Sequence, residues 1–163
     1  MSLSRRIAVA LDEPLAPGAG QPGTISAEEA PHRLTLAVQA ANPVGVEVVN
    51  LAFSDTDPDQ PERSLDDLKA WADRVATRVT YLMEPLVLLE VDSQGGEAEL
   101  RSQKPTAREG RRTFYEVRLN RQGTLRIVRV AFDEADRSRR EISFQLTREV
   151  LERLTDDLVA TAG

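Results

Sequence analysis

Residues 85–158 contain five strand-length segments joined by short connections, and no other feature constrains the fold as much. The segments are Pro85–Asp92, Glu97–Gln103, Arg112–Asn120, Thr124–Phe132 and Glu141–Leu146. A crossover between parallel strands needs about a dozen residues or more, so these connections predict hairpins and an antiparallel sheet. A closing amphipathic helix follows at 148–160, with Val150, Leu151, Leu154 and Leu158 on one face.

A second helix is predicted over residues 65–79. Ser64 is a suitable N-cap, and Leu65, Leu68, Val75 and Val79 form one apolar stripe. The single tryptophan, Trp71, belongs to this helix and is expected to pack it on the sheet as a core residue. The predicted fold class is α+β, a mainly antiparallel sheet of about five to eight strands with both helices packed on one face.

Two further strands are predicted before the first helix, at 33–40 and 44–54. Leu34, Leu36 and Val38 alternate as in a strand, although the segment 33–41 also suits a helix face. Asn42-Pro43-Val44-Gly45 is a turn signal. The apolar alternation changes parity near Val48, which predicts a β-bulge there.

The chain begins with a short apolar run that is predicted to be a strand, with Ile7, Val9 and Leu11 on its buried face. A mobile Pro/Gly-rich loop is expected at 12–24, since this stretch holds several prolines and glycines. The length of 163 residues favours a single α+β domain over residues 1–163.

The strand-rich block carries three more specific expectations. Residues 86–91 are apolar at almost every position, which predicts a central strand covered on both sides. A three-residue turn at Arg121-Gln122-Gly123 would pair Arg118 with Arg126 across the hairpin. A second change of parity, between Ile127 and Val128, predicts a second bulge.

The composition excludes several classes of function. The absence of cysteine excludes disulfides, thiolate catalysis and cysteine-based metal sites. The net charge of −6 opposes binding of the whole protein to nucleic acid or anionic lipid. The longest apolar runs are too short to span a membrane, so a soluble, cytoplasmic protein without membrane partners is expected.

No catalytic residue, metal site or cofactor is predicted. His32 is the only histidine, and no nucleophile motif accompanies it. Asp55, Asp57 and Asp59 alternate like the first ligands of a calcium loop. However, Gln60 replaces the glycine of that loop, and Asp66 replaces its bidentate glutamate. A non-catalytic role is therefore expected in preference to an enzyme.

Charge is distributed unevenly along the chain. Residues 1–100 carry seven basic and seventeen acidic side chains, whereas residues 101–140 carry twelve basic and five acidic ones. Arg101, Arg118 and Arg126 fall on outward-facing strand positions and are the candidate contacts for an anion or a partner. The alternative is a solvated sheet face whose charge is balanced by acidic residues nearby in space.

The predicted order of elements is similar to that of two known groups of domains. Strands followed by a helix, five strands and a closing helix resemble helix-grip ligand-binding domains, in which a curved antiparallel sheet wraps a helix. The same order is similar to that of small acidic secretion chaperones. Both resemblances concern the order of elements and not motif residues.

Three functions follow as expectations. The first is a non-catalytic protein-interaction or assembly module, in which a homo-oligomer and a separate protein partner both remain open. The second is a small-molecule binding domain with an apolar pocket between the sheet and the helices. The third, anion or nucleic-acid binding through the Arg-rich hairpin, ranks last because of the overall negative charge.

Overall fold

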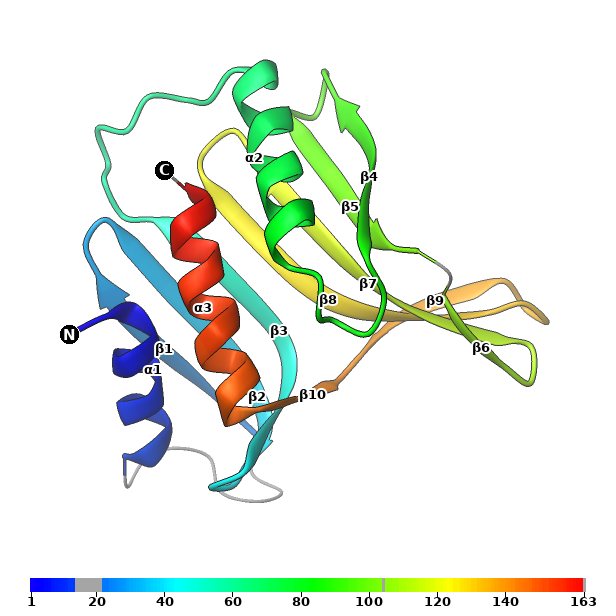
Figure 1. Cartoon of the computed structure of the whole chain (residues 1–163). Coiled ribbons are helices and arrows are strands. Elements are labelled where there is room, and N and C mark those ends of the chain that lie inside the picture. Colours follow the sequence, from blue (N-terminus) through cyan, green and yellow to red (C-terminus); the bar gives the residue numbers. More distant parts are fainter. Residues whose placement is uncertain (14–21, 104, 163) are drawn as a thin grey trace.

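The chain folds as an α+β protein around one mainly antiparallel sheet (Figure 1). The computed structural model describes residues 1–13, 22–103 and 105–162, within which it contains three helices and ten strands. The helices are α1 (Leu3–Asp12), α2 (Leu65–Arg78) and α3 (Arg148–Ala162). The strands are β1 (Gly23–Glu29), β2 (His32–Ala41), β3 (Gly45–Asp55), β4 (Leu86–Asp92), β5 (Glu97–Ser102), β6 (Thr106–Arg108), β7 (Arg111–Asn120), β8 (Thr124–Asp133), β9 (Ser138–Ile142) and β10 (Phe144–Thr147).

The strand order confirms the fold class predicted from the short connections. Neighbouring strands follow the order β1-β2-β3-β8-β7-β5-β4, with β10 beside β3, β9 beside β8 and β6 beside β7. Every pairing among the described residues is antiparallel. The sheet has more strands than expected because β1 and β6 gave no clear signal, and because the last predicted strand is divided into β9 and β10.

The prediction of a strand at Ile7–Leu11 is wrong, because these residues belong to helix α1. Leu3, Ile7 and Leu11 recur every four residues and are all buried, whereas Val9 is exposed. The Ser2 hydroxyl caps the helix by accepting a hydrogen bond from the Arg5 N–H at 3.3 Å. A short apolar run fits both the strand period of two residues and the helix period of 3.6 residues. Here the helix forms, because it buries Leu3, Ile7 and Leu11 together in the core.

The loop expected at 12–24 is only partly open to comparison. Residues 14–21 lie outside the described residues, while Asp12 ends α1 and Gly23 begins β1.

Strands β2 and β3 confirm the predicted strands at 33–40 and 44–54. The bulge near Val48 is also confirmed, since Ala37 pairs with Asn50 and Val38 with Val48, which leaves Val49 unpaired.

Helix α2 confirms the prediction for residues 65–79 almost to the residue. The Ser64 hydroxyl accepts a hydrogen bond from the Asp67 N–H at 3.0 Å, and the Asp67 carboxylate accepts one from the Ser64 N–H at 3.3 Å. This reciprocal capping satisfies backbone donors that a helix start leaves unpaired. Trp71 lies fully buried on the inner face of α2, as expected.

The prediction of a central position for residues 86–91 is wrong, because β4 is the last strand at one edge of the sheet. Leu86 faces the core, but Val87 and Leu89 are exposed on the other face. The register also shifts between Leu88 and Glu90. A continuous apolar run indicates that both faces of a strand favour apolar contact. In β4 the face opposite the core is not covered by a second layer, and its Leu89 lines a surface groove.

The hairpin of β7 and β8 confirms the predicted pairing of Arg118 with Arg126. The prediction of a second bulge between Ile127 and Val128 is wrong, since Val117 pairs with Ile127 and Glu116 with Val128 without a register shift. The parity changes because Val128 and Val130 pack with Phe114 on the opposite face of the sheet. A small second apolar cluster therefore produced the signal that a bulge would give.

The predicted strand Glu141–Leu146 is interrupted at Ser143 because the sheet forks there. β3 and β8 pair only over Leu51–Ser54 and Thr124–Ile127 and then diverge. β9 continues on β8, with Ile142 opposite Arg129, and β10 crosses to β3, with Phe144 opposite Val48.

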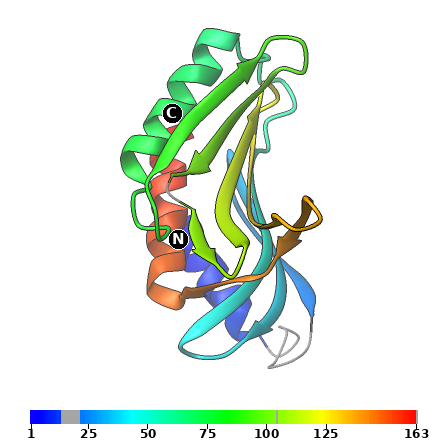
Figure 2. The same cartoon turned by 90° about the vertical axis from the view of Figure 1, so that its right-hand side faces the viewer.

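All three helices cover the same face of the sheet, and the other face carries no helix among the described residues (Figure 2). The main core lies between the two layers and includes Phe53, Leu100 and Leu119 from the sheet. α3 packs against α1, α2, β3 and β10, so it joins the two ends of the helical layer. The prediction of two helices on one face holds for α2 and α3, and α1 adds a third.

Candidate functional site

The three predicted site arginines lie together on the helix-free face of the sheet. Arg118 in β7 is directly opposite Arg126 in β8, and Glu99 in β5 is opposite Arg118. Arg101 lies two residues beyond Glu99 on the same strand and therefore on the same face. The Arg118 and Arg126 side chains are half-exposed.

Each of these arginines has a carboxylate partner. Arg101 lies 3.1 Å from Glu99, and Arg126 lies 3.8 Å from Glu141. Arg118 donates to Glu116 at 2.7 Å and to Glu97 at 3.2 Å. Arg118 and Arg126 thus lie opposite each other but pair with different glutamates, Arg118 with Glu116 and Glu97 and Arg126 with Glu141. This pairing agrees with the alternative of a sheet face whose charges are balanced by acidic residues nearby. A role of the three arginines in contacting an anion or a partner stays a prediction.

Glu116 is the centre of this charge network. It is 1% exposed, although it lies on the helix-free face, because arginine side chains cover it. Arg118 and Arg139 both donate to its carboxylate. Burial acts to raise the pKa of Glu116, but its contacts with Glu99, Arg139 and Arg118 outweigh burial and hold the pKa below its usual value.

Beside this network lies a groove that crosses β4, β5, β7 and β8, which we name the sheet-face groove. It has a volume of about 500 Å³ and is lined by Leu89, Arg101, Ser102, Gln103, Pro105, Arg112, Phe114, Phe132 and Arg139. Its floor is apolar, because Phe114 and Phe132 pack with Val128 and Val130. Leu89 at its edge is 44% exposed.

Arginines frame the apolar floor of the sheet-face groove. The Arg101 guanidinium lies 4.7 Å from the centre of the Phe114 ring, and that of Arg112 lies 5.1 Å from the centre of the Phe132 ring. Phe114 is only 8% exposed beneath this stacking, and both guanidinium groups also pair with glutamates, Arg101 with Glu99 at 3.1 Å and Arg112 with Glu134 at 3.0 Å. The Arg101 Nε is buried and has no hydrogen-bond partner among the described residues.

Sequence reasoning found one of the arginines at this groove and missed the others. Arg101 was predicted, whereas Arg112, Arg139, Phe114 and Phe132 were not. The position of Phe114 could have been predicted from the alternation of side chains along β7, because Phe114, Glu116 and Arg118 lie on the same face of the strand. Arg139 gave no such signal, because only the pairing of β9 with β8 places it opposite Phe132.

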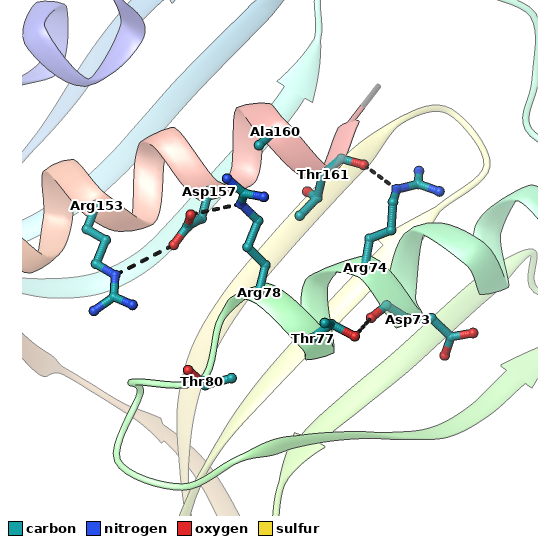
Figure 3. A pocket seen from close by; sticks show the side chains of 9 residues that line it. All are labelled: Asp73, Arg74, Thr77, Arg78, Thr80, Arg153, Asp157, Ala160 and Thr161. Carbon is teal, nitrogen blue, oxygen red and sulfur yellow. Dashed lines mark hydrogen bonds and ion pairs between the residues drawn. The ribbon is translucent and has the colours of Figure 1, made fainter.

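A larger hollow, of about 660 Å³, lies elsewhere, in the cleft between α2 and α3 (Figure 3). Most of its charged groups already have partners in the chain. Arg78 donates to Asp157 at 2.9 Å and Tyr81 donates to the same carboxylate at 2.5 Å, while Arg74 donates to the Thr161 carbonyl at 2.8 Å. These bonds tie α2 and the residues after it to α3. They occupy Arg74, Arg78 and Asp157 without a ligand.

His32 lies at the start of β2 and stacks on Phe53, with 5.2 Å between ring centres. Its Nδ1 is buried without a hydrogen-bond partner in the described chain. Burial lowers the pKa of His32, opposed by the nearby charges of Asp55 and Glu29 and reinforced by that of Arg63. This environment favours a neutral imidazole packed against a core ring.

The lowered pKa of His32 predicts that this residue makes the free energy of unfolding depend on pH. A base with a lowered pKa in the folded state favours folding above its unfolded value of 6.5, and this contribution is lost as the pH falls below it. The urea midpoint of the wild type should therefore fall more than that of His32→Gln between about pH 7.5 and pH 5.5. Equal changes in the two proteins would contradict the burial of His32 as a neutral ring.

Neither a membrane-spanning helix nor a metal cluster is found within the described residues. No helix there is both long and apolar enough to cross a membrane. No group of three or more His, Cys, Asp or Glu side chains in that part of the chain is arranged to hold a metal ion.

Compared with protein-family models, with curated proteins and with solved structures, the chain has no significant match.

Proposed function

We propose that this protein is a non-catalytic interaction module that binds an extended segment of another polypeptide in the sheet-face groove. One observation carries the proposal: an apolar cluster lies on the face of the sheet opposite the three helices. Its rings line a groove whose edge is formed by the exposed Leu89. Phe114 is itself only 8% exposed, so Leu89 is the exposed apolar group at this groove, and an exposed apolar group beside a groove supports a binding surface.

The charges around the groove favour an acidic segment. Arg101, Arg112 and Arg139 surround the apolar floor, each paired with one glutamate of the chain, and the Arg101 Nε lacks a hydrogen-bond partner among the described residues. A carboxylate oxygen can accept from such a guanidinium without moving it far. The preferred occupant therefore combines an apolar side chain, placed over Phe114 and Phe132, with Asp or Glu beside it.

The edge position of β4 favours an extended backbone in the bound segment. Among the described strands β4 pairs with β5 alone, so the backbone groups along its other edge are available to a further strand. A strand added there brings its side chains next to Val87 and Leu89. Addition of a strand to a sheet edge is a common mode of peptide recognition.

Peptide binding measured by fluorescence anisotropy tests this proposal. The probes are labelled peptides of about twelve residues that alternate Leu with Glu, or Leu with Lys, to favour an extended form. We expect saturable binding of the Leu/Glu peptide and none of the Leu/Lys peptide. Leu89→Asp should weaken binding about tenfold or more, since it removes a buried apolar contact and adds a repelling charge.

Val44→Asp is the matched control, because Val44 is also an exposed apolar residue but lies in the turn between β2 and β3. It should bind the Leu/Glu peptide like the wild type. Equal weakening by Val44→Asp and Leu89→Asp, or equal binding of both peptides, would overturn the proposal. Gel filtration with light scattering adds a further arm, in which self-association lost in Leu89→Asp would identify a second copy as the occupant.

A further inference from the structure

Arg129 is a buried arginine without a counter-charge in the described chain. It lies in β8 opposite Tyr115 and is 7% exposed. Its Nη2 donates to the Thr113 hydroxyl at 2.9 Å, and its guanidinium lies 4.6 Å from the centre of the Tyr115 ring. Its Nη1 has no hydrogen-bond partner, and no carboxylate of the described residues forms an ion pair with it.

This environment is unfavourable for a permanent cation. A guanidinium remains protonated in proteins, so it cannot escape burial by losing its proton. A buried charge without a partner is costly, and proteins normally pair it or bind a ligand there. Arg118 and Arg126 on the opposite face each contact a glutamate even though both are half-exposed. Arg129 departs from it, since its neighbours in the described chain are the neutral Thr113 hydroxyl and the neutral Tyr115 side chain and not a carboxylate.

The fork in the sheet leaves a pocket beside Arg129. β8 and β3 diverge after their short pairing, and the pocket is lined by residues of β7, β8, β10, the start of α3 and the segment that follows α2. The pocket has a volume of about 370 Å³. Leu82, Phe144, Leu146 and Val150 form the apolar part of its wall, and polar side chains form the rest. This size and lining suit a small ligand.

Arg129 brings a positive charge to the pocket, while two carboxylates lie just outside its lining, since Glu47 accepts a hydrogen bond from the Ser143 hydroxyl at 2.6 Å and the charge of Glu84 acts on Tyr115. Among the described residues that line it, Arg129 is the only charged one. The first turn of α3 borders the pocket through Thr147 and Val150, and a helix start carries partial positive charge. Tyr115 also lines the pocket, and burial raises the pKa of its hydroxyl, so that this group remains a hydrogen-bond donor.

We propose that this pocket binds a small monocarboxylate with a compact apolar body. The carboxylate pairs with the Arg129 guanidinium, and the apolar body packs against Leu82, Phe144 and Val150. A single cation with one helix start matches one negative charge better than the larger charge of a phosphate. The site is separate from the sheet-face groove, and its occupancy does not depend on the function proposed for that groove.

Titration calorimetry and thermal unfolding of the full chain test the proposal with simple probes. The probes are benzoate, hexanoate and octanoate, the matching uncharged amides, and inorganic phosphate. We expect at least one carboxylate to bind saturably and raise the melting temperature, and we expect its amide and phosphate not to do so. Binding of an amide as tightly as its carboxylate, or no binding of any carboxylate at millimolar concentration, would refute the proposal.

Variants assign the binding to Arg129. Arg129→Met keeps much of the side-chain volume but removes the charge, and it should weaken carboxylate binding about tenfold or more. Arg126→Met, the matched arginine control on the other face of β8, should bind like the wild type. Arg129→Met should also unfold no more easily than the wild type without ligand, since an unpaired buried charge is replaced by an apolar group.

A second variant tests the apolar part of the pocket independently of Arg129. Val150→Phe fills space next to Phe144 and should block binding while Arg129 is retained. If Arg129→Met does not fold, Val150→Phe and the comparison of carboxylates with amides still decide the matter. Unchanged binding in both Arg129→Met and Val150→Phe would place the carboxylate elsewhere and overturn the proposal.

Discussion

Leu154→Ala is expected to lower the free energy of unfolding by about 2–5 kcal/mol, the range for truncating a buried leucine. Leu154 is fully buried in the main core, near the middle of α3. α3 contacts both other helices and the sheet, so a cavity at this position removes contacts that surrounding residues cannot easily replace. A typical domain is stable by only about 5–15 kcal/mol, so the expected loss is a large fraction of the total.

Urea unfolding of both proteins measures this effect, with the midpoint expected to fall and the slope to stay the same. Asp156→Ala provides a control on the exposed side of the same helix and should change the free energy of unfolding by less than about 0.5 kcal/mol. A loss below about 0.5 kcal/mol for Leu154→Ala would place Leu154 outside the core. It would also contradict the packing of α3 on the sheet.

Glu116→Gln is expected to destabilise the protein by about 1–3 kcal/mol at neutral pH, the usual cost of losing a hydrogen bond to a buried charge. The substitution keeps the shape of the side chain but leaves Arg118 and Arg139 without their shared carboxylate. Both arginines are roughly half-exposed and can turn toward water, which keeps the cost below that of a fully buried pair.

The pH dependence of the Glu116 effect follows from its lowered pKa. An acid with a lowered pKa in the folded state stabilises the fold above its unfolded value of 4.5, and this contribution is lost as the pH falls through the folded value. The deficit of Glu116→Gln relative to the wild type should therefore shrink as the pH is lowered from about 7 to about 4. Urea melts at each pH measure this deficit.

Glu99→Gln is the matched control on the neighbouring strand. Burial, followed by the contact with Glu116, raises the pKa of Glu99, so its contribution favours folding at low pH and weakens as the pH rises through the folded value. Its deficit at neutral pH should be smaller than that of Glu116→Gln and should not shrink on acidification. Identical pH profiles for the two variants would contradict the central place of Glu116 in the charge network.

Local patterns were sufficient for much of the fold. The capped helix α2, the closing helix α3 and the hairpin of β7 and β8 all followed from side-chain periodicity and turn residues. These elements are specified by neighbours a few residues away, so their signals survive without knowledge of the rest of the chain. The same local reasoning correctly placed Arg118 opposite Arg126.

The errors arose where the meaning of an apolar residue depended on distant partners. The run at Ile7–Leu11 fits a strand until Leu3 is seen to share the buried stripe of α1. The apolar strand β4 would suit the centre of a sheet, but pairing places it at the edge with Leu89 exposed. The parity change at Val128 marked a second apolar cluster and not a bulge.

The sequence by itself determined the α+β class, the two longest helices and the outward direction of Arg101, Arg118 and Arg126, because these depend on periodicity within single elements. The tertiary structure alone decided which charges are paired. It places Glu97 and Glu141 beside different arginines, buries Glu116 beneath Arg118 and Arg139, and leaves Arg129 without a partner among the described residues. Ion pairing depends on distances between atoms across strands, and strand order and the fork of the sheet set those distances.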